Sequence, residues 1–98
     1  MFKLGLMSKK LLYRIIVIVR VQGVGFRWSA AREASKLDIS GFVRNQEDGS
    51  VYIEAEGSED QLNVFLNWCR IGPRSGLVQS VDFTIVTPAG YTDFRIEH

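Results

Sequence analysis

The residues with the clearest potential for chemistry lie in a short glycine-containing segment, Gln22-Gly23-Val24-Gly25-Phe26-Arg27. Glycines let such a segment curl so that successive backbone N–H groups point to one spot. A helix is predicted to begin at about Phe26, and a helix N-terminus adds partial positive charge. Arg27 adds a guanidinium fork that matches phosphate oxygens. The segment therefore predicts a phosphate-binding cradle.

The better-known nucleotide-binding loops do not fit this segment. Gly23-Val24-Gly25-Phe26-Arg27-Trp28 lacks the third glycine of the dinucleotide-binding fingerprint, and nowhere does the sequence match the P-loop pattern with its Gly-Lys-Ser/Thr ending. Many short glycine loops before helices are only turns. Whether this segment binds phosphate therefore depends on which other residues the surrounding strands and helices bring close to it.

Period-two alternation of apolar side chains predicts the strands. Every odd position of residues 13–21 is apolar, which is typical of a strand with one buried face. Asp48-Gly49 between two alternating runs is typical of a hairpin turn. Strands are predicted at 13–21, 41–45, 50–56, 81–85 and 94–96.

Two helices are predicted between these strands. Apolar and small residues recur at helical spacing over 26–37. Ser58 and Gln61 form a capping box, and the helix that follows ends at Gly72-Pro73. One face of this second helix carries Leu62, Phe65, Leu66 and Cys69.

The element order β-α-β-β-α-β with a short extra C-terminal strand predicts a ferredoxin-like α/β sandwich, an antiparallel sheet with two helices on one face. In this fold the first and second strands are parallel, with the third between them, so their carboxyl ends share one edge of the sheet. Asn45 ends the second strand, about 10 Å from the glycine segment by two strand spacings. A small ligand could bridge that gap.

Two stretches, Val21-Gln22-Gly23-Val24-Gly25-Phe26-Arg27 and Gly41 to Val51, followed by Gly57, resemble the acylphosphatase family. The Gly72-Pro73-Arg74-Ser75 turn is also similar, and the resemblance covers about residues 11–98. It implies metal-independent, cofactor-free hydrolysis of the carboxyl–phosphate bond of small acyl phosphates, with inorganic phosphate as product. It also implies that Arg27 binds the phosphate together with the backbone amides of Gln22, Gly23, Val24, Gly25 and Phe26, and that the Asn45 side chain positions the attacking water.

Two positions depart from the family pattern. Val19 stands where the family usually has glycine, so a displaced loop with weakened catalysis is one expectation. Asp38 stands at a helix end where glycine is frequent. Because Asp can adopt the left-handed conformation, we expect only a small stability cost there.

Composition limits the other classes of function. The 98 residues, 46% of them apolar, suffice for one domain with one core. The net charge of +1 disfavours strong nonspecific nucleic-acid binding. Residues 1–44 hold nine Lys and Arg against two acids, whereas residues 45–98 hold three against nine, so an anion site is expected in the first half.

The single cysteine, Cys69, and the single histidine, His98, cannot form an internal disulfide or a four-ligand zinc site of these residue types. A reducing cytoplasm and a monomer are expected. Basic residues interrupt every apolar stretch, which disfavours export and membrane insertion. Residues 1–10 are expected to form a poorly ordered extension before a single domain at 11–98, and Met7 is an alternative start to Met1.

Three alternative interpretations compete with catalysis. The whole chain could be an anion-binding or regulatory module of the same fold. Asn45 could merely satisfy backbone groups at the hairpin turn. RNA binding is disfavoured because the central strand is expected to expose Tyr52, Glu54 and Glu56, and the two carboxylates would repel phosphates.

Overall fold

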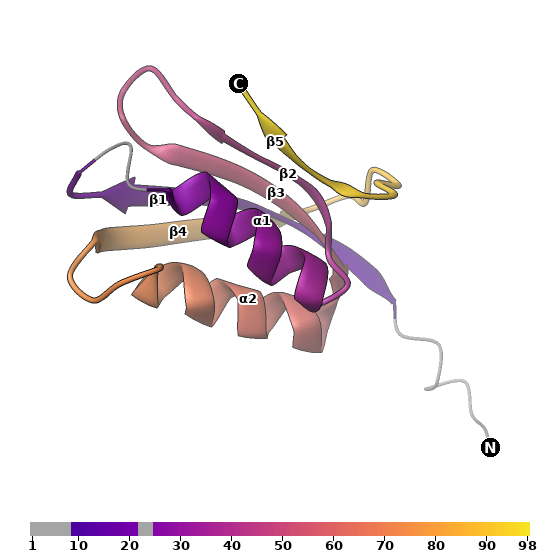
Figure 1. Cartoon of the computed structure of the whole chain (residues 1–98). Helices are drawn as coiled ribbons and strands as arrows, with labels where there is room; N and C mark the ends of the chain where they lie inside the picture. Colours follow the sequence, from indigo (N-terminus) through magenta and orange to yellow (C-terminus); the bar gives the residue numbers. More distant parts are fainter. Residues whose placement is uncertain (1–8, 22–24) are drawn as a thin grey trace.

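The computed structural model describes residues 9–21 and 25–98. Two helices pack on one face of a five-stranded sheet (Figure 1). The elements in chain order are β1 (Lys10–Val19), α1 (Phe26–Lys36), β2 (Ser40–Asn45), β3 (Val51–Ser58), α2 (Glu59–Ile71), β4 (Val78–Val86) and β5 (Phe94–Glu97). β1 therefore begins one residue inside the expected extension, of which residues 1–8 lie outside the described part.

The sheet has the strand order β4-β1-β3-β2-β5. β3 lies between β1 and β2 and is antiparallel to both, and β4 is antiparallel to β1. The ferredoxin-like prediction is thereby confirmed. The added strand β5 is instead parallel to β2, so the sheet is mixed rather than purely antiparallel. β4 and β5 lie at opposite edges of the sheet, and the chain reverses direction between them. Because β4 is antiparallel to β1, and β1 and β2 have the same direction, this reversal makes β5 parallel to β2.

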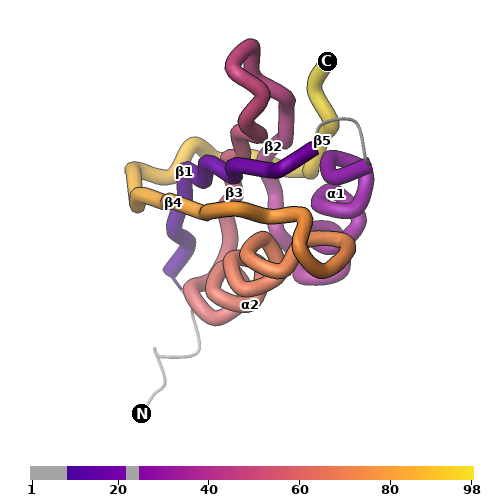
Figure 2. Tube along the Cα trace, turned by 90° about the vertical axis from the view of Figure 1, so that its left-hand side faces the viewer, coloured from indigo at the N-terminus to yellow at the C-terminus, as the bar shows by residue number. Residues whose placement is uncertain are grey.

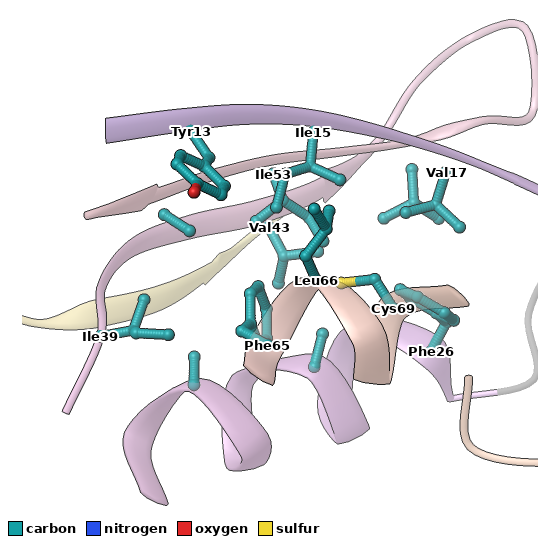
Figure 3. Packing of buried hydrophobic residues seen from close by; sticks show 14 of the residues in the cluster. Tyr13, Ile15, Val17, Phe26, Ile39, Val43, Ile53, Phe65, Leu66 and Cys69 are labelled. Atoms are coloured by element: carbon teal, nitrogen blue, oxygen red, sulfur yellow. The ribbon is translucent and has the colours of Figure 1, made fainter. Parts of the chain in front are cut away.

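The core fills the space between the sheet and the helices (Figure 3). Tyr13, Ile15 and Val17 point from alternate positions of β1 toward α2, which contributes Phe65 and Cys69. The capping box predicted at Ser58 and Gln61 is present, and α2 ends at Gly72 as expected. Asp38 has φ 59°, the left-handed conformation anticipated for it.

The crossover 87–93 lies on the face of the sheet opposite the helices. The Glu56 carboxylate accepts hydrogen bonds there from the N–H groups of Ala89 at 2.8 Å and Gly90 at 3.0 Å, and the Tyr91 hydroxyl donates to Glu54 at 2.5 Å. Glu56 is consequently only 4% exposed. The expectation that Glu56 faces solvent is wrong, because it holds the crossover in place.

Gly41 fixes the start of β2 against its neighbour. Its φ of 140° is outside the range that L side chains readily adopt, and a Cβ there would lie 1.8 Å from the Glu54 carbonyl oxygen. Its N–H donates to the Asp93 carbonyl at 2.8 Å. Gly41, part of the second sequence motif, is therefore required for the close approach of β2 to β3.

Candidate functional site

The elements that carry the predicted site residues end or begin at one edge of the sheet. β1 and β2 are parallel, and β5 is parallel to β2, so the carboxyl ends of all three strands face the same way. Figure 2 shows the hairpin between β2 and β3 and the C-terminus projecting from the same end of the molecule, close to the start of α1. This edge is the one predicted from the topology.

The start of α1 is built differently from the start of α2. Its N-cap is Gly25, in the left-handed conformation with φ 79° and ψ 18°, which supplies no capping side chain, and its first turn carries no acidic residue. At α2, by contrast, a capping box and two acids occupy the first turn. The first N–H groups of a helix need partners, and an anion can supply them. Of the predicted phosphate-binding residues, Gly25, Phe26 and Arg27 are described, whereas Gln22, Gly23 and Val24 lie outside the described residues.

Phe26 anchors this helix start in the core. Its side chain is 5% exposed and lies against Trp68 of α2, with ring centroids 5.4 Å apart. The next residue, Arg27, lies on the β5 side of the helix start, where it contacts Glu97.

Arg27 reaches the end of β5. Its Nη1 donates to the Glu97 carbonyl oxygen at 2.9 Å and lies 3.4 Å from the His98 Nδ1. The guanidinium group is thereby held at the edge where β2 also ends, with further N–H groups left for a ligand. No local pattern in the sequence predicts this contact with Glu97 or His98, since seventy residues separate Glu97 from Arg27 in the chain.

Asn45 is the last residue of β2, and its side chain is exposed. Its neighbours make the hydrogen bonds of the turn. Gln46 donates its N–H to the Ser50 carbonyl at 2.8 Å, and Asp48 Oδ1 accepts from the Ser50 N–H at 2.9 Å and from its hydroxyl at 2.6 Å. The Ser50 hydroxyl and N–H also lower the pKa of the Asp48 carboxyl. Asp48 therefore fills the structural role that was the alternative for Asn45.

Arg44, the residue before Asn45 in β2, points to the face of the sheet away from the helices, where Phe42 and Tyr52 also lie. Its guanidinium carbon is 5.5 Å from the Phe42 ring centroid and 5.0 Å from that of Tyr52, and its Nη1 is 3.8 Å from a Glu97 carboxylate oxygen. A shallow surface hollow beside it is lined by residues 44–48. Arg44 adds positive charge next to Asn45, although its own contacts are structural.

Val19 lies at an irregularity of the sheet. Ile18 pairs with Ser80 and Val19 with Val78, so that Gln79 of β4 is an extra residue, a β-bulge. The Val19 side chain is partly buried and packs against the core, as its place in the alternation predicted. Val19, three residues before the glycine segment, therefore contributes to the packing of the core.

Val19→Gly is expected to lower stability by about 2 kcal/mol, because it removes a partly buried β-branched side chain and loosens the backbone. Turnover should stay unchanged or rise, since glycine restores the family residue. Thermal unfolding and steady-state kinetics on the same preparation check both expectations. A folded variant with collapsed turnover would show instead that this chain needs Val19 to shape its loop.

Other chemistries find no support in the described residues. Over 9–21 and 25–98, the structure contains no group of three His, Cys, Asp or Glu side chains that could hold a metal ion. Cys69 is buried, and burial raises the pKa of its thiol far above the usual value. None of the helices in this part of the chain is long and apolar enough to cross a membrane.

The sequence and the structure of this chain are both similar to those of known acylphosphatases. The sequence model of the acylphosphatase family matches residues 13–96. A curated acylphosphatase from Thermotoga maritima is 47% identical over 78 residues, which cover 80% of this chain and 87% of the relative. The structure of an acylphosphatase from Coxiella burnetii is 29% identical, with a TM-score of 0.87 over 93% of this chain and 98% of that one. The acylphosphatase structure from Bacillus subtilis is 40% identical, with a TM-score of 0.84 over 90% of this chain and 99% of that one. The chain therefore belongs to the acylphosphatase family.

Proposed function

We propose that this chain hydrolyses small acyl phosphates by direct attack of a water molecule on phosphorus, with no side chain acting as nucleophile. The water oxygen forms a bond to phosphorus while the bond between phosphorus and the acyl oxygen breaks. The carboxylate leaves with the electron pair of that bond, and inorganic phosphate is the second product. A proton of the attacking water passes to a phosphoryl oxygen of the substrate.

This chemistry asks the protein for positioning and charge stabilisation rather than for a strong base. A carboxylate is a good leaving group, so the barrier depends on alignment of the water and on the negative charge of the equatorial phosphoryl oxygens. We propose that Arg27 binds those oxygens together with the backbone amides of residues 22–26. A guanidinium group can hold two oxygens at once, and it keeps its charge at every physiological pH.

Asn45 is proposed to position the water. An amide suits this role because its carbonyl can accept a hydrogen bond from the water while its NH₂ group donates to a phosphoryl oxygen. A carboxylate at the same place would repel the substrate. The observation that carries the proposal is the meeting of the α1 start, with Arg27, and the β2 end, with the exposed Asn45, at one edge of the sheet.

We further propose that the chain acts as a cytoplasmic monomer on a small-molecule acyl phosphate, without a nucleic acid or membrane partner. The buried Cys69 supports a reducing compartment, since it has no second cysteine to pair with. The crossover 87–93 supports the exclusion of RNA, because it lies across the open face of the sheet. Its Gly90 N–H donates a hydrogen bond to Glu56, and its Tyr91 hydroxyl donates one to Glu54.

Release of inorganic phosphate from benzoyl phosphate, measured in excess chelator, tests the proposed reaction. We expect full activity, because the described residues offer no metal-binding cluster near the site. A matched calorimetric titration with inorganic phosphate separates catalysis from binding alone. Phosphate binding without turnover would favour the anion-binding module that the Val19 departure motivates, and activity that disappears in chelator and returns with Mg²⁺ would contradict the metal-independent mechanism.

A further inference from the structure

Glu97, the last residue of β5, contacts both halves of the site through different atoms. Its main-chain carbonyl oxygen accepts the hydrogen bond from Arg27 at 2.9 Å. Its carboxylate oxygen lies 3.8 Å from the Nη1 of Arg44, the residue before Asn45. One residue therefore joins the helix start that carries Arg27 to the strand end that carries Asn45.

Strand pairing and two aromatic rings place the Arg44 guanidinium beside the Glu97 carboxylate. Arg44 and Glu97 are the last described pair of the parallel register between β2 and β5, so the carboxylate and the Arg44 guanidinium extend from paired positions. The rings of Phe42 and Tyr52 hold the guanidinium at centroid distances of 5.5 Å and 5.0 Å. Arg44 is thus a fixed partner for the end of a strand that has only four residues and pairs on one side.

We propose that Glu97 is a positioning residue for phosphate binding. Its ion pair with Arg44 fixes the end of β5, and its carbonyl oxygen then orients the Arg27 guanidinium toward the ligand before the ligand arrives. An arginine side chain loses much rotamer freedom when it binds, and prior orientation reduces that cost. This proposal rests on the proposed function, since it requires Arg27 to hold the phosphate.

Glu97→Gln distinguishes positioning from a simple field effect. The carboxylate is an anion near an anion site, so its removal would tighten phosphate binding if only long-range electrostatics mattered. Loss of the ion pair acts in the opposite direction, because the end of β5 and the carbonyl oxygen become less fixed. We expect the Kd for inorganic phosphate and the KM to rise about threefold at low ionic strength, the scale of an exposed ion pair, while kcat changes less.

Asp93→Asn is the matched control. It makes the same charge change in the residue before β5, where Asp93 pairs with Arg95 at 3.2 Å. Its phosphate Kd should equal that of the wild type. Arg44→Met should weaken binding at least as much as Glu97→Gln, because it also removes a positive charge near the site. The double variant should bind no more weakly than Arg44→Met alone, since both lack the same ion pair.

Calorimetry with inorganic phosphate on the full chain, with thermal unfolding as a check of folding, decides the proposal. Unchanged or tighter binding by a folded Glu97→Gln variant would overturn it, as would an equal loss in Asp93→Asn. A loss caused by His98→Ala but not by Glu97→Gln would transfer the role to the histidine ring and also overturn it. Arg27→Ala separates failure of the proposed phosphate site from failure of the role given to Glu97. If Arg27→Ala binds phosphate normally, the proposed site is wrong. If Arg27→Ala loses binding and Glu97→Gln does not, only the role of Glu97 is wrong.

Discussion

Arg27→Ala is expected to lower kcat/KM by on the order of 10³, with weaker phosphate binding as well as slower turnover, because the guanidinium is proposed to hold charge in both the ground state and the transition state. Arg27→Lys should recover little of this loss. An ammonium group is a point charge and cannot reproduce two parallel hydrogen bonds to phosphoryl oxygens. Steady-state kinetics with benzoyl phosphate and calorimetry with phosphate measure the two effects.

Folding of the Arg27 variants must be checked, since Arg27 also holds the end of β5 through the Glu97 carbonyl oxygen. That contact is exposed, so its loss should cost about 1 kcal/mol of stability or less. A folded Arg27→Ala variant whose kcat/KM stays within tenfold of the wild type would refute the role given to this residue.

Asn45→Ala is expected to behave differently, because Asn45 is proposed to hold water rather than phosphate. Its phosphate Kd should stay near that of the wild type, while kcat falls by on the order of 10² to 10³, the scale for removal of one preorganised polar group. Asn45→Asp should be as poor or worse, since a carboxylate repels the phosphoryl oxygens. Kinetics and phosphate calorimetry on the same preparations provide the comparison.

The unfolding temperature of Asn45→Ala is the control that separates a catalytic role of Asn45 from a structural one. The turn is held by Asp48, Ser50 and Gln46, so Asn45→Ala should unfold at nearly the same temperature as the wild type. If the variant keeps its kcat and instead loses stability, Asn45 is a turn residue and the water must be positioned by another group.

Local patterns in the sequence were sufficient to predict most of the fold. Alternation over residues 13–19 of β1, the Asp48-Gly49 turn and the capping box at Ser58 each depend on residues close together in the chain, and the structure confirms all three. The predicted strand end at Val21 is wrong, because β1 ends at Val19 and Val21 is 55% exposed. The order of these elements then leaves few topologies, because parallel strands need a crossover and two helices can cover only one face. The edge of the sheet where Arg27 and Asn45 lie follows from that topology.

Features that depend on the last strand could not be predicted in the same way. The pairing of β5 with β2, the burial of Glu56 and the contact of Arg27 with Glu97 all join residues far apart in the chain, and no periodicity encodes them. The edge strand β4 shows the same limit. Phe83 and Ile85 alternate as core residues would, yet they are 38% and 55% exposed, because β4 has a neighbouring strand on one side only.

Hydrolysis of benzoyl phosphate in oxygen-18-labelled water tests the central claim, attack of water on phosphorus, most directly. The products would be separated and the label located by mass spectrometry. Because the bond between phosphorus and the acyl oxygen is the one expected to break, one labelled oxygen per turnover should enter the inorganic phosphate and none should enter the benzoate. Label in the benzoate would show that water attacks the carbonyl carbon, and it would contradict the roles assigned to both Arg27 and Asn45.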